Sequence, residues 1–135
     1  MRNISQLERA LAWEAPEPNR RTMGVMFERD ITPTRNIAAG YVRIPPGGKQ
    51  VRMSVHEGVE EIYFVVTGRA RYFLGDETFE LDTWSAVYVP PGTPHKAENS
   101  GDTDLILYFV NTPSAFGEPG GYRRFVTGWT QVAEG

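Results

Sequence analysis

Short apolar segments separated by turn residues make up most of the chain from residue 22 onwards. The separators are clusters of proline, glycine, asparagine and aspartate, such as Pro45-Pro46-Gly47-Gly48 and Asn99-Ser100-Gly101-Asp102. Many short strands at close, even spacing are typical of an all-β sandwich or barrel. The pattern predicts strands at 22–28, 38–45, 50–56, 61–67, 69–74, 78–81, 86–89 and 104–110.

The two ends of the chain differ from this pattern. A short helix is predicted at 3–14, because the apolar residues there fall roughly on one helical side, and Pro16 would end it. The tail after Thr112 is rich in glycine and aromatic residues, so we expect it to be irregular except around 123–127. No linker divides the chain. We therefore predict a single domain over 1–135, comprising an N-terminal segment 1–37, a barrel core of about 38–111 and a C-terminal extension 112–135.

The predicted strand at 61–67 is apolar on both of its faces between Ile62 and Val66. Since side chains alternate along a strand, Glu61, Tyr63 and Val65 are placed on the inner face and Glu60 on the outer one. The outer apolar face would then need a cover, either from the N-terminal segment or from a second subunit. This pattern favours a homodimer.

Composition and charge limit the classes of function. The chain has 135 residues, no cysteine and a formal net charge of −3. Binding to nucleic acid or to an anionic membrane through bulk charge is not expected, and cysteine nucleophiles, disulfides and thiolate metal sites are excluded. The start of the chain lacks the apolar stretch of a signal peptide, and no apolar run approaches the ~20 residues that span a bilayer. We expect a cytoplasmic protein with no nucleic-acid or membrane partner.

Two histidines carry the candidate chemistry, and both lie close to predicted strands. His56 precedes Glu60 and Glu61, and His95 follows the turn Pro90-Pro91-Gly92-Thr93-Pro94. Two imidazoles and one carboxylate with open coordination positions form the metal site of non-haem Fe(II) oxygenases, and imidazole also suits Zn, Cu and Ni. Neighbouring strands of one barrel could bring His56, Glu61 and His95 together.

The same segments resemble the two sequence motifs of the cupins, which are small jelly-roll barrels. The first motif, G-x5-H-x-H-x3-4-E-x6-G, is matched at Gly48, Ser54, His56, Glu61 and Gly68. The second, G-x5-P-x-G-x2-H-x3-N, is matched at Pro90, Gly92, His95 and Asn99, with Trp84 in place of the leading glycine. The resemblance covers about Gly40 to Val110, and it implies a cupin-type jelly-roll β-barrel.

The resemblance also implies one divalent metal, usually held by the two histidines and the glutamate of the first motif and by the histidine of the second. Carried over, these positions are Ser54, His56, Glu61 and His95. Serine is a poor ligand, so the site would hold three protein ligands, with Ser54 or Gln50 as candidates for the fourth position. The alternative is a cupin that has lost its metal and keeps both histidines as hydrogen-bonding groups. Ligand type leaves Fe, Mn, Ni, Zn and Cu open.

Two more residues are candidates for a substrate pocket. Arg52 shares a face with Ser54 and His56 if 50–56 is a regular strand. It would then bind a substrate carboxylate or phosphate, or form a salt bridge to a neighbouring acid. Tyr63 would orient the substrate or donate a proton, unless it only lines the pocket.

Cupins host many activities, so the resemblance leaves several functions open for this chain. The first is a metal-dependent enzyme acting on a small organic molecule inside the barrel, with dioxygenation as the leading reaction if the metal is Fe(II). With Zn or Mn the metal would act as a Lewis acid for isomerase, cyclase or lyase chemistry. The last alternative is a small-ligand-binding protein without catalysis, and no particular catalytic residue is predicted.

Overall fold

The computed structural model describes residues 3–135, and almost all of its regular structure is β-strand. The elements within that range are η1 (Leu7–Arg9), β1 (Leu11–Glu14), β2 (Thr22–Phe27), β3 (Ala38–Ile44), β4 (Glu60–Thr67), β5 (Ala70–Leu74), β6 (Glu77–Leu81), β7 (Ala86–Val89), β8 (His95–Asn99), β9 (Leu105–Thr112), α1 (Tyr122–Phe125) and β10 (Thr130–Ala133).

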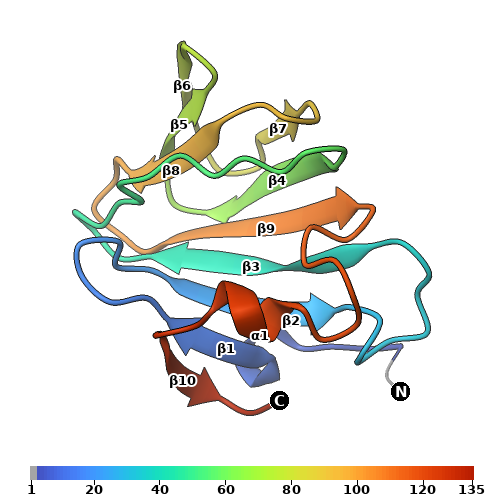
Figure 1. Cartoon of the computed structure of the whole chain (residues 1–135). Helices are drawn as coiled ribbons and strands as arrows, with labels where there is room; N and C mark the ends of the chain where they lie inside the picture. The colour runs from blue at the N-terminus through green and yellow to red at the C-terminus, as the bar shows by residue number, and fades with distance from the viewer. Residues whose placement is uncertain (1–2) are drawn as a thin grey trace.

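The strands form two antiparallel sheets. The larger has the order β10-β1-β2-β3-β9-β4-β7, and the smaller has the order β6-β5-β8. Figure 1 shows the larger sheet rising from β10 to β4 and β7, with the smaller sheet beside its upper end. Adjacent strands in this order, such as β3 and β9, are far apart in the sequence. This arrangement is the jelly-roll barrel that the motifs imply, and strands from outside 38–111 join its larger sheet.

Apolar side chains from both sheets meet in the interior. One cluster joins Val65 and Leu107 of the larger sheet to Tyr72 and Ala97 of the smaller one. A second cluster lies at the opposite end, where Tyr122 of α1 packs with side chains of β1 and β2. Between the two clusters the barrel encloses a cavity, which contains the histidines.

The predicted helix at 3–14 is wrong. Only Leu7–Arg9 forms a 3-10 turn, and the chain then continues as strand β1. Side chains alternate there: Ala12 packs in an outer cluster with Tyr41, whereas Trp13 packs in the inner cluster with Met23. Alternating burial along β1 and its pairing to β2 and β10 favour a strand. The helical pattern counted Ile4 as part of the buried side, but Ile4 is 81% exposed.

Two other segments differ from the prediction. Residues 50–56 form no strand; they make only an isolated bridge between Ser54 and His95, next to a second bridge at Lys49. The regular alternation that would have turned Arg52 inward is therefore absent, and Arg52 is exposed. Conversely, β10 lies in the tail that we expected to be irregular, where it pairs with β1.

The outer face of β4 is not covered within the described chain. Ile62 is 49% exposed and Val66 is 40% exposed, so the prediction that both faces of this strand are buried is wrong for a single chain. Tyr88 of β7 lies beside Ile62 and is 50% exposed. The N-terminal segment instead covers the outer side of β2 and β3, through Leu7 and Ala10.

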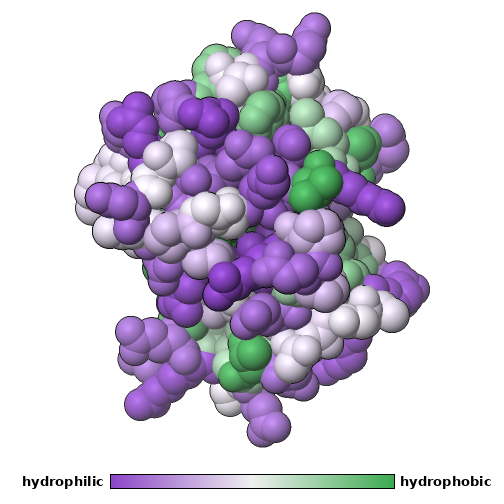
Figure 2. Space-filling view, turned by 90° about the vertical axis from the view of Figure 1, so that its left-hand side faces the viewer, coloured by the Kyte–Doolittle hydropathy of each residue, from purple (hydrophilic) through white to green (hydrophobic). Residues whose placement is uncertain are grey.

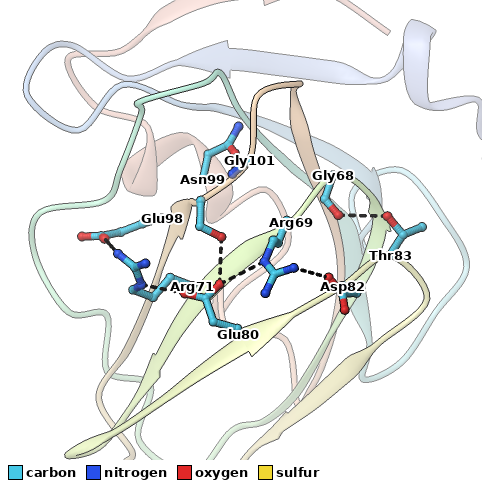
Figure 3. Close-up of polar contacts among 10 residues, drawn as sticks. Gly68, Arg69, Arg71, Glu80, Asp82, Thr83, Glu98, Asn99 and Gly101 are labelled. Carbon is cyan, nitrogen blue, oxygen red and sulfur yellow. Dashed lines mark hydrogen bonds and ion pairs between the residues drawn. The ribbon is translucent and has the colours of Figure 1, made fainter.

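The outer face of the smaller sheet is polar, in contrast. Arg69 contacts Asp82 at 2.9 Å and Glu80 at 3.4 Å, and Arg71 contacts Glu80 at 2.8 Å and Glu98 at 3.9 Å (Figure 3). Such half-exposed pairs contribute little to stability. They do give this face a charged surface that needs no cover.

Trp84 holds an unusual backbone conformation just before β7. Its φ is +75°, in the left-handed region that favours glycine, and a bulky residue is rare there. This position is where the second cupin motif has its leading glycine, and the structure gives the conformational reason for that glycine. The Trp84 side chain is 79% exposed and packs edge-on against Phe64, with the ring centroids 5.5 Å apart.

The side of the molecule drawn in Figure 2 is mainly hydrophilic, with hydrophobic residues in small, separate groups. No helix within residues 3–135 has the length and apolar character needed to cross a membrane.

Candidate metal centre

His56, Glu61 and His95 lie together inside the barrel. His56 belongs to the loop that leads into β4, Glu61 is the second residue of β4, and His95 is the first residue of β8. The Glu61 Oε1 atom is 3.7 Å from His56 Nε2 and 3.4 Å from His95 Nε2. All three ligand atoms lie within 4.8 Å of one another. The structure thus brings together the three residues that the motifs place on ligand positions.

Backbone hydrogen bonds fix this meeting point. Ser54 and His95 exchange two of them, at 2.8 and 2.9 Å, and the Gly92 N–H donates to the His56 carbonyl at 3.0 Å. The irregular loop before β4 is therefore tied to the start of β8, which holds both histidines beside Glu61 without a strand at 50–56.

The environment of the three side chains fits a metal ion. Glu61 is 2% exposed, and neither its Oε1 atom nor His95 Nε2 has a hydrogen-bond partner among the described residues. Buried polar atoms without partners are rare in folded proteins. Metal–ligand bonds of about 2.0–2.2 Å would place two ligand atoms about 2.8–3.6 Å apart at right-angled or tetrahedral geometry. The separation of 3.4 Å between Glu61 Oε1 and His95 Nε2 lies within this range, and the 3.7 Å to His56 Nε2 is just above it.

The imidazoles are prepared to bind a metal. His95 Nδ1 lies 3.0 Å from the Thr93 carbonyl oxygen, so Nδ1 donates a hydrogen bond there and Nε2 is the ring atom that faces Glu61. Burial lowers the pKa of His56, with Glu61 acting in the opposite direction. A neutral His56 adds no positive charge beside the buried Glu61 carboxylate, and a divalent metal would add one.

Ser54 and Gln50, the two candidates for a fourth position, are bonded to each other. Gln50 Nε2 donates to Ser54 Oγ at 2.7 Å, and both residues line the cavity. The Gln50 amide thus occupies one of the two acceptor positions of the Ser54 hydroxyl and leaves the other open.

The triad opens into an inner cavity that is partly open to solvent. Its wall is largely apolar, with Tyr63 and Tyr72 beside the triad; the Tyr63 ring centroid is 5.7 Å from that of His95 and 5.6 Å from that of Tyr72. Burial, followed by the Glu61 carboxylate, raises the pKa of Tyr63 well above its ordinary value. Burial likewise raises the pKa of Tyr72, so both hydroxyls keep their protons and act as donors.

The entrance to the cavity contains a residue that the sequence did not reveal. An outer hollow, here called the mouth, shares Arg21, Gln50, Ser54 and Phe125 with the inner cavity. Arg52 lines the mouth only, on its exposed side, whereas Arg21 reaches the cavity itself. The arginine at the cavity is therefore one that lies 31 positions earlier in the sequence.

Tyr72 was missed although the sequence carried a signal for it. Ala70, Tyr72 and Leu74 alternate with Arg69 and Arg71, a pattern that turns Tyr72 inward. For Arg21 the signal was weaker. It precedes β2 on the same face as Met23, but only the tertiary fold shows that this face surrounds the cavity.

Comparisons with known proteins agree with this architecture. A family model described as "Cupin domain" matches residues 40–111, just over half of the chain. Protein MJ1618 of Methanocaldococcus jannaschii is 37% identical over 70 residues, which are 52% of this chain and 56% of MJ1618, so the chain spans little more than half of that relative. The polyketide synthase CurC of Streptomyces cyaneus is 29% identical over 101 residues, covering 73% of this chain and 66% of CurC.

Among solved structures, a predicted oxalate decarboxylase of Thermotoga maritima superposes with a TM-score of 0.72. It is 18% identical and covers 82% of this chain and 98% of its own. At that identity the likeness concerns the fold alone. The match to the family model, together with the jelly-roll sheets and the two motifs, shows that this chain belongs to the cupin family.

Proposed function

We propose that this cupin is a metal-dependent enzyme that acts on a small oxygenated organic molecule inside the barrel. One observation carries the proposal: a buried carboxylate and two imidazoles converge beside a largely apolar cavity, and the Glu61 Oε1 and His95 Nε2 atoms among them have no hydrogen-bond partner within the described residues. Fe, Mn, Ni or Zn would suit His56, Glu61 and His95. A bound metal would supply Lewis acidity, and as Fe(II) it would also supply reactivity with O2.

The chain's own groups would bind and orient the substrate. Thr93 fixes the ring of His95, and Gln50 fixes the hydroxyl of Ser54. The Tyr63 and Tyr72 hydroxyls keep their protons and donate hydrogen bonds to substrate oxygens. Apolar walls exclude bulk water and strengthen these contacts.

Dioxygenation is the first candidate reaction. His56, Glu61 and His95 would hold Fe(II) with the two-histidine, one-carboxylate donor set of Fe(II) oxygenases, and the iron would supply reactivity with O2. The serine at the first motif position keeps the number of protein ligands at three.

Cyclisation or isomerisation without oxygen is the second candidate. The similarity to CurC extends over 101 residues and so includes sequence outside the cupin motifs. Aromatic rings of Tyr63, Phe109 and Phe116 in the cavity would suit an unsaturated substrate.

The proposal is tested on protein purified without a histidine tag, stripped with a chelator and reloaded with Fe(II), Mn(II), Ni(II) or Zn(II). We expect a single tightly bound ion per chain. Catechol and acetylacetone, which chelate metals through two oxygens, should change the visible absorption of the Fe(II) form. Oxygen uptake that requires both iron and such a probe would support dioxygenation.

Other outcomes separate the alternatives. Anaerobic conversion of a polyketone by the Zn(II) or Mn(II) form would favour cyclisation. Tight metal and probe binding without turnover over a broad panel would indicate a binding protein. Metal well below one ion per chain after reloading with all four metals would rule out the metal-dependent enzyme.

We further propose that the active form is a homodimer assembled through the outer face of β9, β4 and β7. Ile62, Val66 and Tyr88 expose apolar surface there, and the strained, 79% exposed Trp84 adds to it. Glu60 and Arg43 lie at opposite ends of this face, because they pair with opposite ends of β9. A two-fold axis between two copies would set each glutamate against the partner copy's arginine.

The dimer is checked by measuring mass in solution. Wild-type protein should have twice the 15.2-kDa chain mass, and Ile62→Asp should reduce it to the single-chain value because a buried, unpaired charge opposes association. Val132→Asp, at a 53% exposed site on β10, is the control and should leave the dimer intact. A monomeric wild type would contradict the proposal.

A further inference from the structure

Arg21 places a positive charge at the wall of the inner cavity. It comes just before β2, and backbone bonding of its carbonyl to the Ala15 N–H holds the turn that positions it. Its guanidinium lies over the Trp129 ring, 4.8 Å from the centroid, and donates to the Asn19 carbonyl at 3.1 Å. Arg21 is partly buried, and this burial lowers the pKa of its guanidinium.

No acid compensates this charge within residues 3–135. Neither Arg21 nor Arg52 has a carboxylate at ion-pairing distance, and no aspartate or glutamate lines the mouth. Glu61, the acid of the inner cavity, faces the two histidines. A partly buried guanidinium without a counter-ion has donors available for a carboxylate, which it binds in bidentate geometry.

Tyr72 supplies an independent observation on the other side of the cavity. The residue is 1% exposed and lines the cavity, and its hydroxyl has no hydrogen-bond partner among the described residues. A metal bound by the triad would satisfy Glu61 and His95 but would leave this donor unpaired. A polar atom of a ligand in the cavity would pair it.

Arg21 and Tyr72 line the same inner cavity as Tyr63. The Tyr63 ring centroid is 5.6 Å from that of Tyr72 and 5.7 Å from that of His95, so both tyrosines lie beside the triad. A ligand held by Arg21 in this cavity would contact the apolar wall and could extend towards Tyr72.

We propose that the substrate is a small organic acid whose carboxylate binds Arg21 and whose apolar body carries a second oxygen towards Tyr72 and the triad. The orientation towards the triad rests on the proposed metal-dependent function, whereas the contact with Arg21 does not. Arg21 is thus a specificity-determining residue: it selects an anion over a neutral molecule of the same shape.

The test compares acids with their neutral isosteres by titration calorimetry, on metal-free and Zn(II)-loaded protein. Benzoate and cyclohexanecarboxylate are matched with benzamide and cyclohexanecarboxamide. We expect the acids to bind about ten- to a hundredfold more tightly, the usual effect of a hydrogen bond to a charged group. Arg21→Gln should remove this preference without changing the zinc content.

Arg20→Gln is the matched control, because the neighbouring arginine is exposed and lines neither the inner cavity nor the mouth. It should keep the preference for acids. Tyr72→Phe should weaken the binding of phenylglyoxylate, which has a keto oxygen in addition to its carboxylate, more than the binding of benzoate. Equal binding of acids and amides by wild type, no binding of any acid, or equal losses in the two arginine variants would overturn the proposal. Loss of zinc from wild type would instead count against the metal site alone.

Discussion

Replacing His95 with alanine is expected to abolish metal binding. Structural zinc sites with four ligands are worth about 10–16 kcal/mol, so one ligand of a set contributes on the order of 3 kcal/mol, roughly a hundredfold in affinity. The loss is larger in a site with three protein ligands, because only two would remain. Metal content after dialysis and competition with a chromophoric chelator measure the effect.

The matched control for this variant is Glu60→Gln. Glu60 precedes Glu61 on β4, but its carboxylate faces outward and accepts a hydrogen bond from the Tyr88 hydroxyl at 2.8 Å. It should bind metal like the wild type. Since His95 is buried and its ring stacks on Tyr72, His95→Gln is a second variant that retains volume while removing the imidazole. Equal metal affinity in His95→Gln and Glu60→Gln would refute the ligand assignment.

The largest effect on stability is expected from Gly40→Ala. A Cβ at Gly40, in the middle of β3, would lie 2.0 Å from the Gly24 carbonyl oxygen and 3.0 Å from the Phe109 ring. The first contact is with the backbone of the neighbouring strand β2, which cannot rotate away as a side chain would. Overpacking typically costs 1–3 kcal/mol, and we expect about 3 kcal/mol or more in the free energy of unfolding.

Gly101→Ala provides the comparison. A Cβ there would meet its nearest atom at an ordinary 3.5 Å, and the residue has no left-handed φ. Its unfolding free energy should stay within about 0.5 kcal/mol of wild type. Chemical denaturation measures both free energies of unfolding, provided that the slope of the free energy against denaturant concentration is the same in both variants and in the wild type. Equal midpoints for the two alanine variants would show that β2 and β3 can separate without cost.

The barrel and the residues at its centre could be predicted because the motifs fix the number of residues between tight turns of the chain. Gly68, which closes the first motif, has φ +87°, and a Cβ there would lie 2.6 Å from the Asp104 carbonyl oxygen. Such constraints act between residues close in the sequence, so they are visible as fixed intervals between motif positions. These intervals identified His56, Glu61 and His95 as one group, although 50–56 is not a strand.

The remaining features depend on contacts between distant segments. Arg52 was expected inside because regular alternation was assumed for a loop that is held by one bridge at Ser54. Arg21 reaches the cavity because β2 lies between β1 and β3 in the wall of the barrel, and β10 forms because β1 offers it an edge. The residue pattern within either segment does not show which distant strand will lie beside it. The homodimer, the cytoplasmic location and the identity of the metal stay predictions.

The arginines of the mouth also affect how fast molecules enter. A cationic entrance attracts anions and repels a divalent cation, and salt screens both effects over about 10 Å at 0.1 M ionic strength. Raising the ionic strength should therefore slow the arrival of an organic acid and speed the arrival of a free metal ion. After a metal has bound, the same charges would favour the arrival of an acid over that of a second cation.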